Sequence, residues 1–179
     1  MRYLALLRGI NVGGNNLVQM TELRTCLENM GLKNVTTYIQ SGNALFEAPS
    51  TGIAKLSRAI EEALSNTLVT NPQVVVVSQK QLEIVVGNAP PDFGADPSKY
   101  RYDVAFIKPP CCARDLLPTI SLKQGVDEAF EGNDVLYFKR LITRASESRL
   151  PKLVSLPAYK SLTIRNWNTT TKLHKLMTA

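Results

Sequence analysis

The chain has few of the residues that most enzymes use for chemistry. Its 179 residues include one histidine, one tryptophan and three cysteines. The histidine, His174, lies close to the C-terminal end, where helices fray, and is a poor candidate for catalysis. The cysteines lack the spacing of zinc ligands, and the carboxylates form no recognisable magnesium site or acid–base pair. We therefore expect no metal and no cofactor, and whether the protein is an enzyme stays open.

Long apolar runs are missing as well. The opening residues 1–8 are too short an apolar run for a signal peptide, and no window approaches the roughly 20 apolar residues of a membrane helix. Cys111 and Cys112 are adjacent, which is a poor arrangement for a structural disulfide, and Cys26 makes the number odd. These absences predict a cytoplasmic protein with no membrane contact.

Positive charge is concentrated toward the C-terminus. The net charge is +6, and residues 135–179 contain nine lysines and arginines against the single acid Glu147. Residues 1–89 contain seven against six. Such a basic segment is typical of a protein with an anionic partner, either a nucleic acid or an anionic small molecule. A solvated face of a basic protein gives the same count, so both interpretations remain open.

Apolar periodicity gives the first half the order βαββαβ, which is the split-βαβ or ferredoxin-like unit. The expected elements are a strand at 3–8, a helix at 20–30, strands at 35–40 and 44–47, a helix at 53–64 and a strand at 74–77. Ser78 and Gln81 resemble a capping box that begins a short helix ending at Gly87.

The second half repeats this order. Its expected elements are a strand at 102–107, a helix at 113–120, two strands around 132–134, a helix at 146–155, a strand at 161–165 and a terminal helix. A connector rich in proline separates the halves. We therefore expect an α+β fold of two ferredoxin-like βαββαβ halves, an internal architectural duplication, plus a C-terminal helix. The expected domains are 1–88, a connector at 89–101, and 102–179.

Two polar stretches follow expected strands and supply candidate ligand-binding residues. These are Arg8, Gly9, Asn11, Gly13, Gly14 and Asn15 in the first stretch, and Ser41, Gly42 and Asn43 in the second. The loop after the first strand and the hairpin after the second lie at the same end of a ferredoxin-like sheet. Glycine N–H groups, asparagine amides and the Arg8 guanidinium would suit an anion there. The alternative is that these residues only shape tight turns, and the spacing is neither a P-loop nor a dinucleotide fingerprint.

A third stretch joins the last strand to the terminal helix. Its candidate residues are Arg165, Asn166, Trp167, Asn168 and Thr169. We expect Asn168 or a following threonine to cap the helix, whose N-terminus favours anions. Trp167 can stack on a base while Arg165 binds a phosphate, as in proteins that bind single-stranded nucleic acids. The alternative is that the tryptophan is a core anchor.

Residues 6–14, 37–43 and 163–169 resemble the bacterial family catalogued as domain of unknown function 1697. The resemblance spans essentially the whole chain. It implies an α+β protein of two related subdomains and brings no established substrate, cofactor or catalytic residue.

The leading hypothesis is a binding protein for a nucleic acid or a nucleotide-like anion. One alternative is an enzyme that acts on a small phosphorylated or carboxylated metabolite, with Arg8, Asn11, Ser41 and Asn43 as clamps. Another is a protein-interaction module in which the motifs are purely structural. The sequence leaves the oligomeric state and the ligand open.

Overall fold

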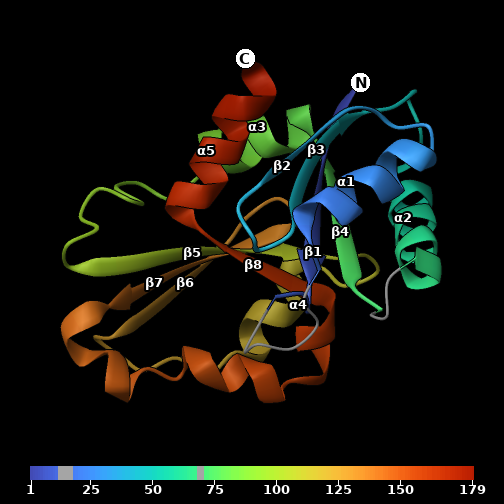
Figure 1. Ribbon diagram of the computed structural model, residues 1–179. Coiled ribbons are helices and arrows are strands. Elements are labelled where there is room, and N and C mark those ends of the chain that lie inside the picture. Colours follow the sequence, from blue (N-terminus) through green and yellow to red (C-terminus); the bar gives the residue numbers. More distant parts are fainter. Residues whose placement is uncertain (12–17, 68–70) are drawn as a thin grey trace. The chain divides into compact units, whose positions relative to one another are not determined.

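The computed structural model describes residues 1–11, 18–67 and 71–179 (Figure 1). Contacts divide the chain into two compact units, Met1–Leu82 with Lys175–Ala179, and Glu83–His174. The segment 89–101, expected as a connector, belongs to the second of these units. No helix in the described part of the chain has the length and apolar character needed to cross a bilayer.

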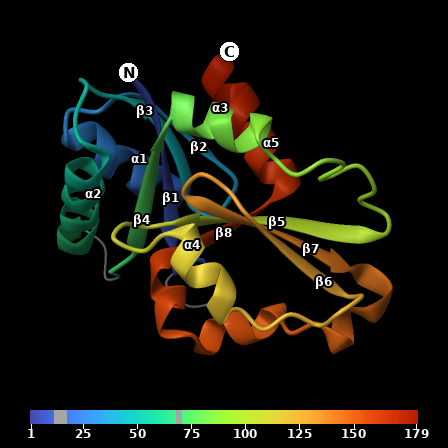
Figure 2. The same cartoon turned by 180° about the vertical axis from the view of Figure 1, so that it is seen from behind.

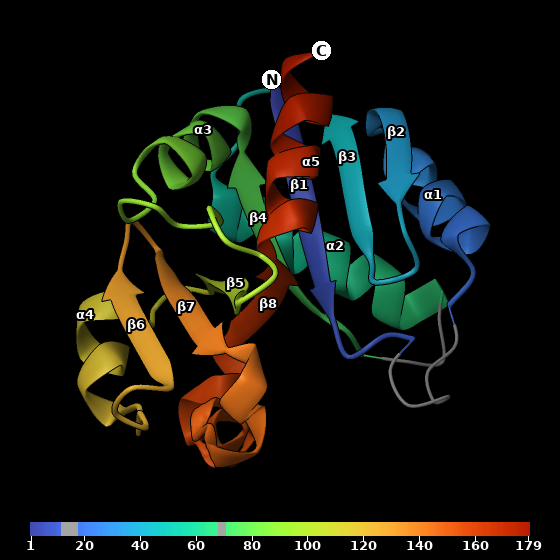
Figure 3. The same ribbon diagram turned by 90° about the vertical axis from the view of Figure 1, so that its left-hand side faces the viewer.

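The first unit is built on a four-stranded antiparallel sheet in the order β2-β3-β1-β4. Its elements are β1 (Arg2–Arg8), α1 (Met20–Asn29), β2 (Lys33–Tyr38), β3 (Asn43–Glu47), α2 (Ile53–Thr67) and β4 (Gln73–Ser78), followed by α3 (Gln79–Gly87). Helices α1 and α2 lie behind this sheet in Figure 3. They bury Leu23, Leu27, Ile60 and Leu64 against one face of the strands.

The second unit repeats this topology with a sheet in the order β6-β7-β5-β8, also antiparallel. Its elements are β5 (Tyr100–Ile107), α4 (Ala113–Leu116), β6 (Asp127–Glu131), β7 (Val135–Leu141), β8 (Leu162–Asn166) and α5 (Trp167–Thr178). Two ferredoxin-like halves and a C-terminal helix are thereby confirmed. Figure 2 shows α4 on one side of this sheet, together with the turns that connect β7 to β8.

The helix expected at residues 146–155 is wrong. The chain between β7 and β8 instead forms three short 3₁₀ helices, η2 (Ile142–Glu147), η3 (Leu150–Ser155) and η4 (Pro157–Ser161), after an earlier η1 (Leu117–Thr119). Proline stands in the first turn of both η3 and η4. Pro151 falls inside the expected helix, where its missing N–H and its ring interrupt α-helical hydrogen bonding.

Two helix starts show how side chains set element boundaries. Ser78 N donates to Gln81 Oε1 (2.9 Å) and Gln81 N donates to Ser78 Oγ (3.3 Å), which confirms the capping box. At α5 the expected cap is wrong by two residues. Asn166 Oδ1 accepts a hydrogen bond from Asn168 N (2.9 Å), so the helix begins at Trp167 and Asn168 lies inside it.

Candidate functional site

The loop after β1 and the β2–β3 hairpin meet at one end of the first sheet, as the topology predicts. Asn11 Nδ2 donates to Gln40 O (2.8 Å) across the two segments, and Leu7 N donates to Gly42 O (2.8 Å). Gly13, Gly14 and Asn15 lie outside the described residues. The structure brings the other candidates together at this end of the sheet. We call this set the rim: Arg8, Gly9, Asn11, Ser41, Gly42 and Asn43.

Both asparagines of the rim hold the backbone. Asn11 Nδ2 also donates to Val18 O (3.0 Å), and its Oδ1 accepts from Val18 N (2.8 Å). Asn43 is fully buried, and its Nδ2 donates to Tyr38 O (2.9 Å) and Ser41 Oγ (3.0 Å). Of the candidates that the structure describes, the amides of Asn11 and Asn43 are therefore engaged in closing the loop and the hairpin.

We expect Asn11→Ala to lower the free energy of unfolding by about 2 kcal/mol, because three hydrogen bonds are lost and alanine is strained at positive φ. Asn34→Ala is the matched control, since Asn34 has the same φ of 52° but is exposed. Urea unfolding measures both variants. Equal losses would show that the hydrogen bonds of Asn11 contribute nothing.

A pocket of about 340 Å³ lies in the second unit, where β8 ends and α5 begins. We call it the Trp167 pocket; it is lined by Gly94, Pro97, Tyr100, Arg101, Tyr102, Arg140, Ile142, Ala145, Asn166, Trp167 and Asn168. Asn166 Nδ2 donates to Tyr102 O (3.0 Å), so its amide covers the backbone of β5 at the point where β8 stops. Three of the residues expected around the tryptophan, Asn166, Trp167 and Asn168, thus line one cavity.

Aromatic contacts fix the tryptophan in place. Phe93 meets Trp167 edge to face at a centroid distance of 5.1 Å and also meets Tyr102 at 5.0 Å. Gly94 lies against the indole so closely that a Cβ there would be 2.3 Å from Trp167 Nε1. Trp167 is half-buried, so it packs against its neighbours without being fully enclosed.

Two arginines stand on one face of the sheet beside this pocket. Arg101 of β5 pairs in register with Arg140 of β7, so the two side chains project to the same side. Arg101 Nε donates to Asp103 Oδ2 (2.7 Å), and this hydrogen bond raises the pKa of Arg101. Arg140 Nε is buried and has no hydrogen-bond partner among the described residues. The pocket therefore contains one guanidinium with an unsatisfied donor.

The nearest acid by register does not neutralise Arg140. Asp127 of β6 lies opposite Arg140. Its carboxylate instead accepts hydrogen bonds from Lys123 N (3.0 Å), Ser148 Oγ (2.6 Å) and Arg149 N (2.8 Å). No acidic residue lines the Trp167 pocket among the residues that the structure describes, but the adjacent Asp103 offsets the charge of Arg101.

Arg165 and Thr169 take no part in this lining. Arg165 pairs in register with Val104, and Asn166 pairs with Asp103, so Arg165 projects to the face opposite Arg101. It is 8% exposed, and burial lowers its pKa to about 10. Thr169 is half-buried in the first turn of α5. The cations that line the Trp167 pocket are Arg101 and Arg140, which sequence reasoning did not identify as site residues because they come from β5 and β7.

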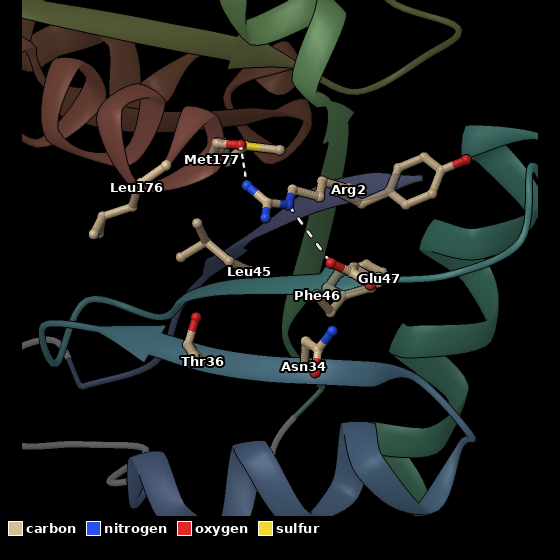
Figure 4. Close-up of a pocket in the computed structure, with 10 residues that line it drawn as sticks. Arg2, Asn34, Thr36, Leu45, Phe46, Glu47, Leu176 and Met177 are labelled. Atoms are coloured by element: carbon tan, nitrogen blue, oxygen red, sulfur yellow. Dashed lines mark hydrogen bonds and ion pairs between the residues drawn. The ribbon is translucent and has the colours of Figure 1, made fainter.

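A second pocket, of about 230 Å³, belongs to the first unit (Figure 4). The last turn of α5 lies over β1 and β3 here, and Leu45 and Leu176 point into the space between them. Arg2 Nη1 donates to Met177 O (2.9 Å), and Arg2 Nε pairs with Glu47 Oε1 at 3.5 Å. The charge of Arg2 is thus used to hold the end of the helix, which makes this pocket a poor anion site.

The sequence matches a family of known proteins. The family described as "Protein of unknown function (DUF1697)" matches residues 1–137. The chain belongs to this family. The match confirms the resemblance and includes the stretches 6–14 and 37–43, whereas 163–169 lies beyond it.

A solved structure is similar to this one over almost the whole chain. The conserved bacterial protein SP0830 from Streptococcus pneumoniae is 30% identical, with a TM-score of 0.86 over 98% of each chain. No curated protein matches the chain. The similar structure thus confirms the fold, and the chemistry of the protein has to be argued from the site.

Proposed function

We propose that this DUF1697 protein is a cytoplasmic binding protein for a nucleotide-like anion, which the second unit holds in the Trp167 pocket. One observation carries the proposal: half-buried Trp167 and two arginines, Arg101 and Arg140, line the same cavity. A planar base stacks on aromatic rings, and arginine binds phosphate through two parallel hydrogen bonds. The volume of about 340 Å³ is near the lower limit for small-molecule sites.

Each part of the ligand has a counterpart in the pocket. In the proposed complex the base stacks on Trp167, and the phosphate lies between Arg101 and Arg140. The unsatisfied Arg140 Nε gains an acceptor when a phosphate oxygen arrives, which removes the cost of a buried donor without a partner. Asn168, which is exposed and lines the Trp167 pocket, supplies an amide for the edge of the base.

We expect Arg101→Gln and Arg140→Gln each to weaken binding of ADP by at least about tenfold, the equivalent of about 1.4 kcal/mol for one charged hydrogen bond. Arg58→Gln, on the exposed face of α2, removes the same charge from the first unit and should leave the affinity unchanged. Quenching of the single tryptophan during titration with ADP gives the affinity. Absence of any saturable response, or equal affinity in all three variants, would contradict the proposal.

A nucleic acid is the alternative anion, and salt separates the two. Binding of a single-stranded RNA by several phosphate contacts weakens steeply as salt rises, whereas one nucleotide in a pocket responds weakly. The basic residues of 135–179 would support the polymer. Titration with a short RNA at 50 and 200 mM salt, beside ADP under the same conditions, therefore decides between them.

The rim of the first unit remains a second proposed anion site, through Arg8, Gly9, Ser41 and Gly42. Arg8→Gln tests this proposal in the same titration. A loss of affinity in Arg8→Gln but not in Arg140→Gln would move the ligand from the Trp167 pocket to the rim.

A further inference from the structure

A third cavity, of about 240 Å³, lies in the second unit next to the Trp167 pocket. We call it the Asp103 pocket; it is lined by Arg101, Asp103, Phe138, Arg140, Leu150, Pro151, Leu153, Val154, Tyr159 and Ile164. Arg101 and Arg140 line both cavities. Because Asp103 and Phe138 pair in register next to the pair Arg101–Arg140, all four side chains project from one face of the sheet. The two pockets thus share these two arginines as parts of their walls.

The Asp103 pocket contains an acceptor that lacks a donor. Asp103 Oδ2 accepts from Arg101 Nε, but Asp103 Oδ1 is buried without a hydrogen-bond partner in residues 1–11, 18–67 and 71–179. A buried carboxylate oxygen in this state is costly, and a ligand hydroxyl would satisfy it. Together with Arg140 Nε, the cavity offers one unsatisfied donor and one unsatisfied acceptor.

The rest of the wall is mostly apolar and comes from η3 and η4 and from the strands β7 and β8. Leu150, Pro151 and Val154 of η3 and Tyr159 of η4 lie around the carboxylate. Val154 is 63% exposed, so the cavity opens to solvent on this side. Apolar and aromatic surfaces beside one carboxylate suit a hydroxylated ring, whose C–H faces pack on the surface while a hydroxyl donates to the acid.

We propose that the ligand is a nucleoside diphosphate esterified to a hydroxylated ring, the class of nucleotide sugars. The nucleoside occupies the Trp167 pocket, the diphosphate lies across Arg101 and Arg140, and the ring enters the Asp103 pocket and donates a hydroxyl to Asp103 Oδ1. This inference rests on the proposed function, because it extends the same ligand across the shared arginines.

Calorimetric titration of the full chain tests the inference with four probes: ADP, ADP-glucose, UDP and UDP-glucose. We expect at least one of the two glucose conjugates to bind tenfold or more tightly than its parent diphosphate. In Asp103→Asn this ratio should fall at least threefold, since the ring hydroxyl then meets a neutral acceptor, while binding of the parent diphosphate improves because a negative charge beside Arg101 is gone.

A variant at the solvent opening separates the ring from the nucleotide. Val154→Gln places a longer neutral side chain at the Asp103 pocket and should lower affinity for the conjugate to that of the parent diphosphate, which itself is unchanged. Ser155→Gln, on the same 3₁₀ helix but outside the lining, is the matched control.

The outcomes distinguish the two proposals. Equal affinity of conjugate and diphosphate in the wild-type chain overturns the inference and leaves the nucleotide site standing. Absence of binding by all four probes overturns both. A conjugate preference that survives Val154→Gln and Asp103→Asn also overturns the inference, because the ring then lies elsewhere.

Discussion

Gly42→Ala is expected to lower the free energy of unfolding by about 3 kcal/mol, from strain at positive φ and from overpacking. Gly42 has a φ of +74°, and a Cβ there would lie 2.9 Å from Leu7 Cβ and 2.6 Å from Ile10 Cδ1. The isoleucine tip can move, but the Leu7 Cβ is fixed by strand β1. Gly42 O also accepts a hydrogen bond from Leu7 N, so a shift of the hairpin away from β1 would break this hydrogen bond.

Gly9→Ala is the control for Gly42→Ala. Gly9 has a φ of +82° with nothing within 4 Å of an added Cβ, so it carries the backbone strain alone, about 1 kcal/mol. Urea unfolding compares the two variants with the wild type. A loss in Gly42→Ala no greater than that in Gly9→Ala would show that the hairpin and the loop after β1 are not packed as described.

Gly94→Ala is expected to cost a similar amount, about 3 kcal/mol, and to disturb the ligand site as well. An added Cβ would lie 2.3 Å from Trp167 Nε1 and 2.4 Å from Cδ1, with a φ of +87° at the same residue. An indole ring cannot yield as an alkyl tip does, so the tryptophan must leave its place against Phe93. We therefore expect a shifted emission maximum and weaker binding of ADP together with the lower stability.

Two further variants isolate the clash from the backbone strain. Gly125, in the same unit, has a φ of +73° and only an ordinary contact, 3.8 Å to Arg144 Nη1, so Gly125→Ala should lose about 1 kcal/mol. In the background Trp167→Ala the added methyl has nothing to strike, and Gly94→Ala should then cost no more than Gly125→Ala. Additive losses in this double-mutant cycle would refute the contact between Gly94 and Trp167.

Local signals in the sequence predicted the first unit well. The spacing of Leu23 and Leu27 predicted helix α1, and the Ser78–Gln81 capping box predicted the start of α3. The expected topology predicted that the loop after β1 lies next to the β2–β3 hairpin. These features depend on residues close in the chain or on the handedness of connections. The prediction of an α-helix at 146–155 was wrong because the apolar spacing was given more weight than Pro151.

The proposed ligand site was predictable only in part. Asn166, Trp167 and Asn168 formed a recognisable stretch, but the cations beside them come from β5 and β7. Sequence proximity favoured Arg165, which is buried on the face of the sheet opposite Arg101 and does not line the pocket. Which residues share a face depends on the register between strands, here Arg101 with Arg140, and one slipped residue reverses it. Such pairing is a property of the folded sheet and cannot be recognised from residues that are close together in the sequence.

In the proposed complex, a nucleotide-like anion stacks beside Trp167 and is held by Arg101 and Arg140. The most direct test is the indole ¹H–¹⁵N resonance of the chain, which has a single tryptophan, recorded during titration with ADP. We predict a saturable shift of this resonance that disappears in Arg140→Gln and persists in Arg58→Gln. An indole resonance that stays in place at millimolar ADP in the folded protein would contradict the account.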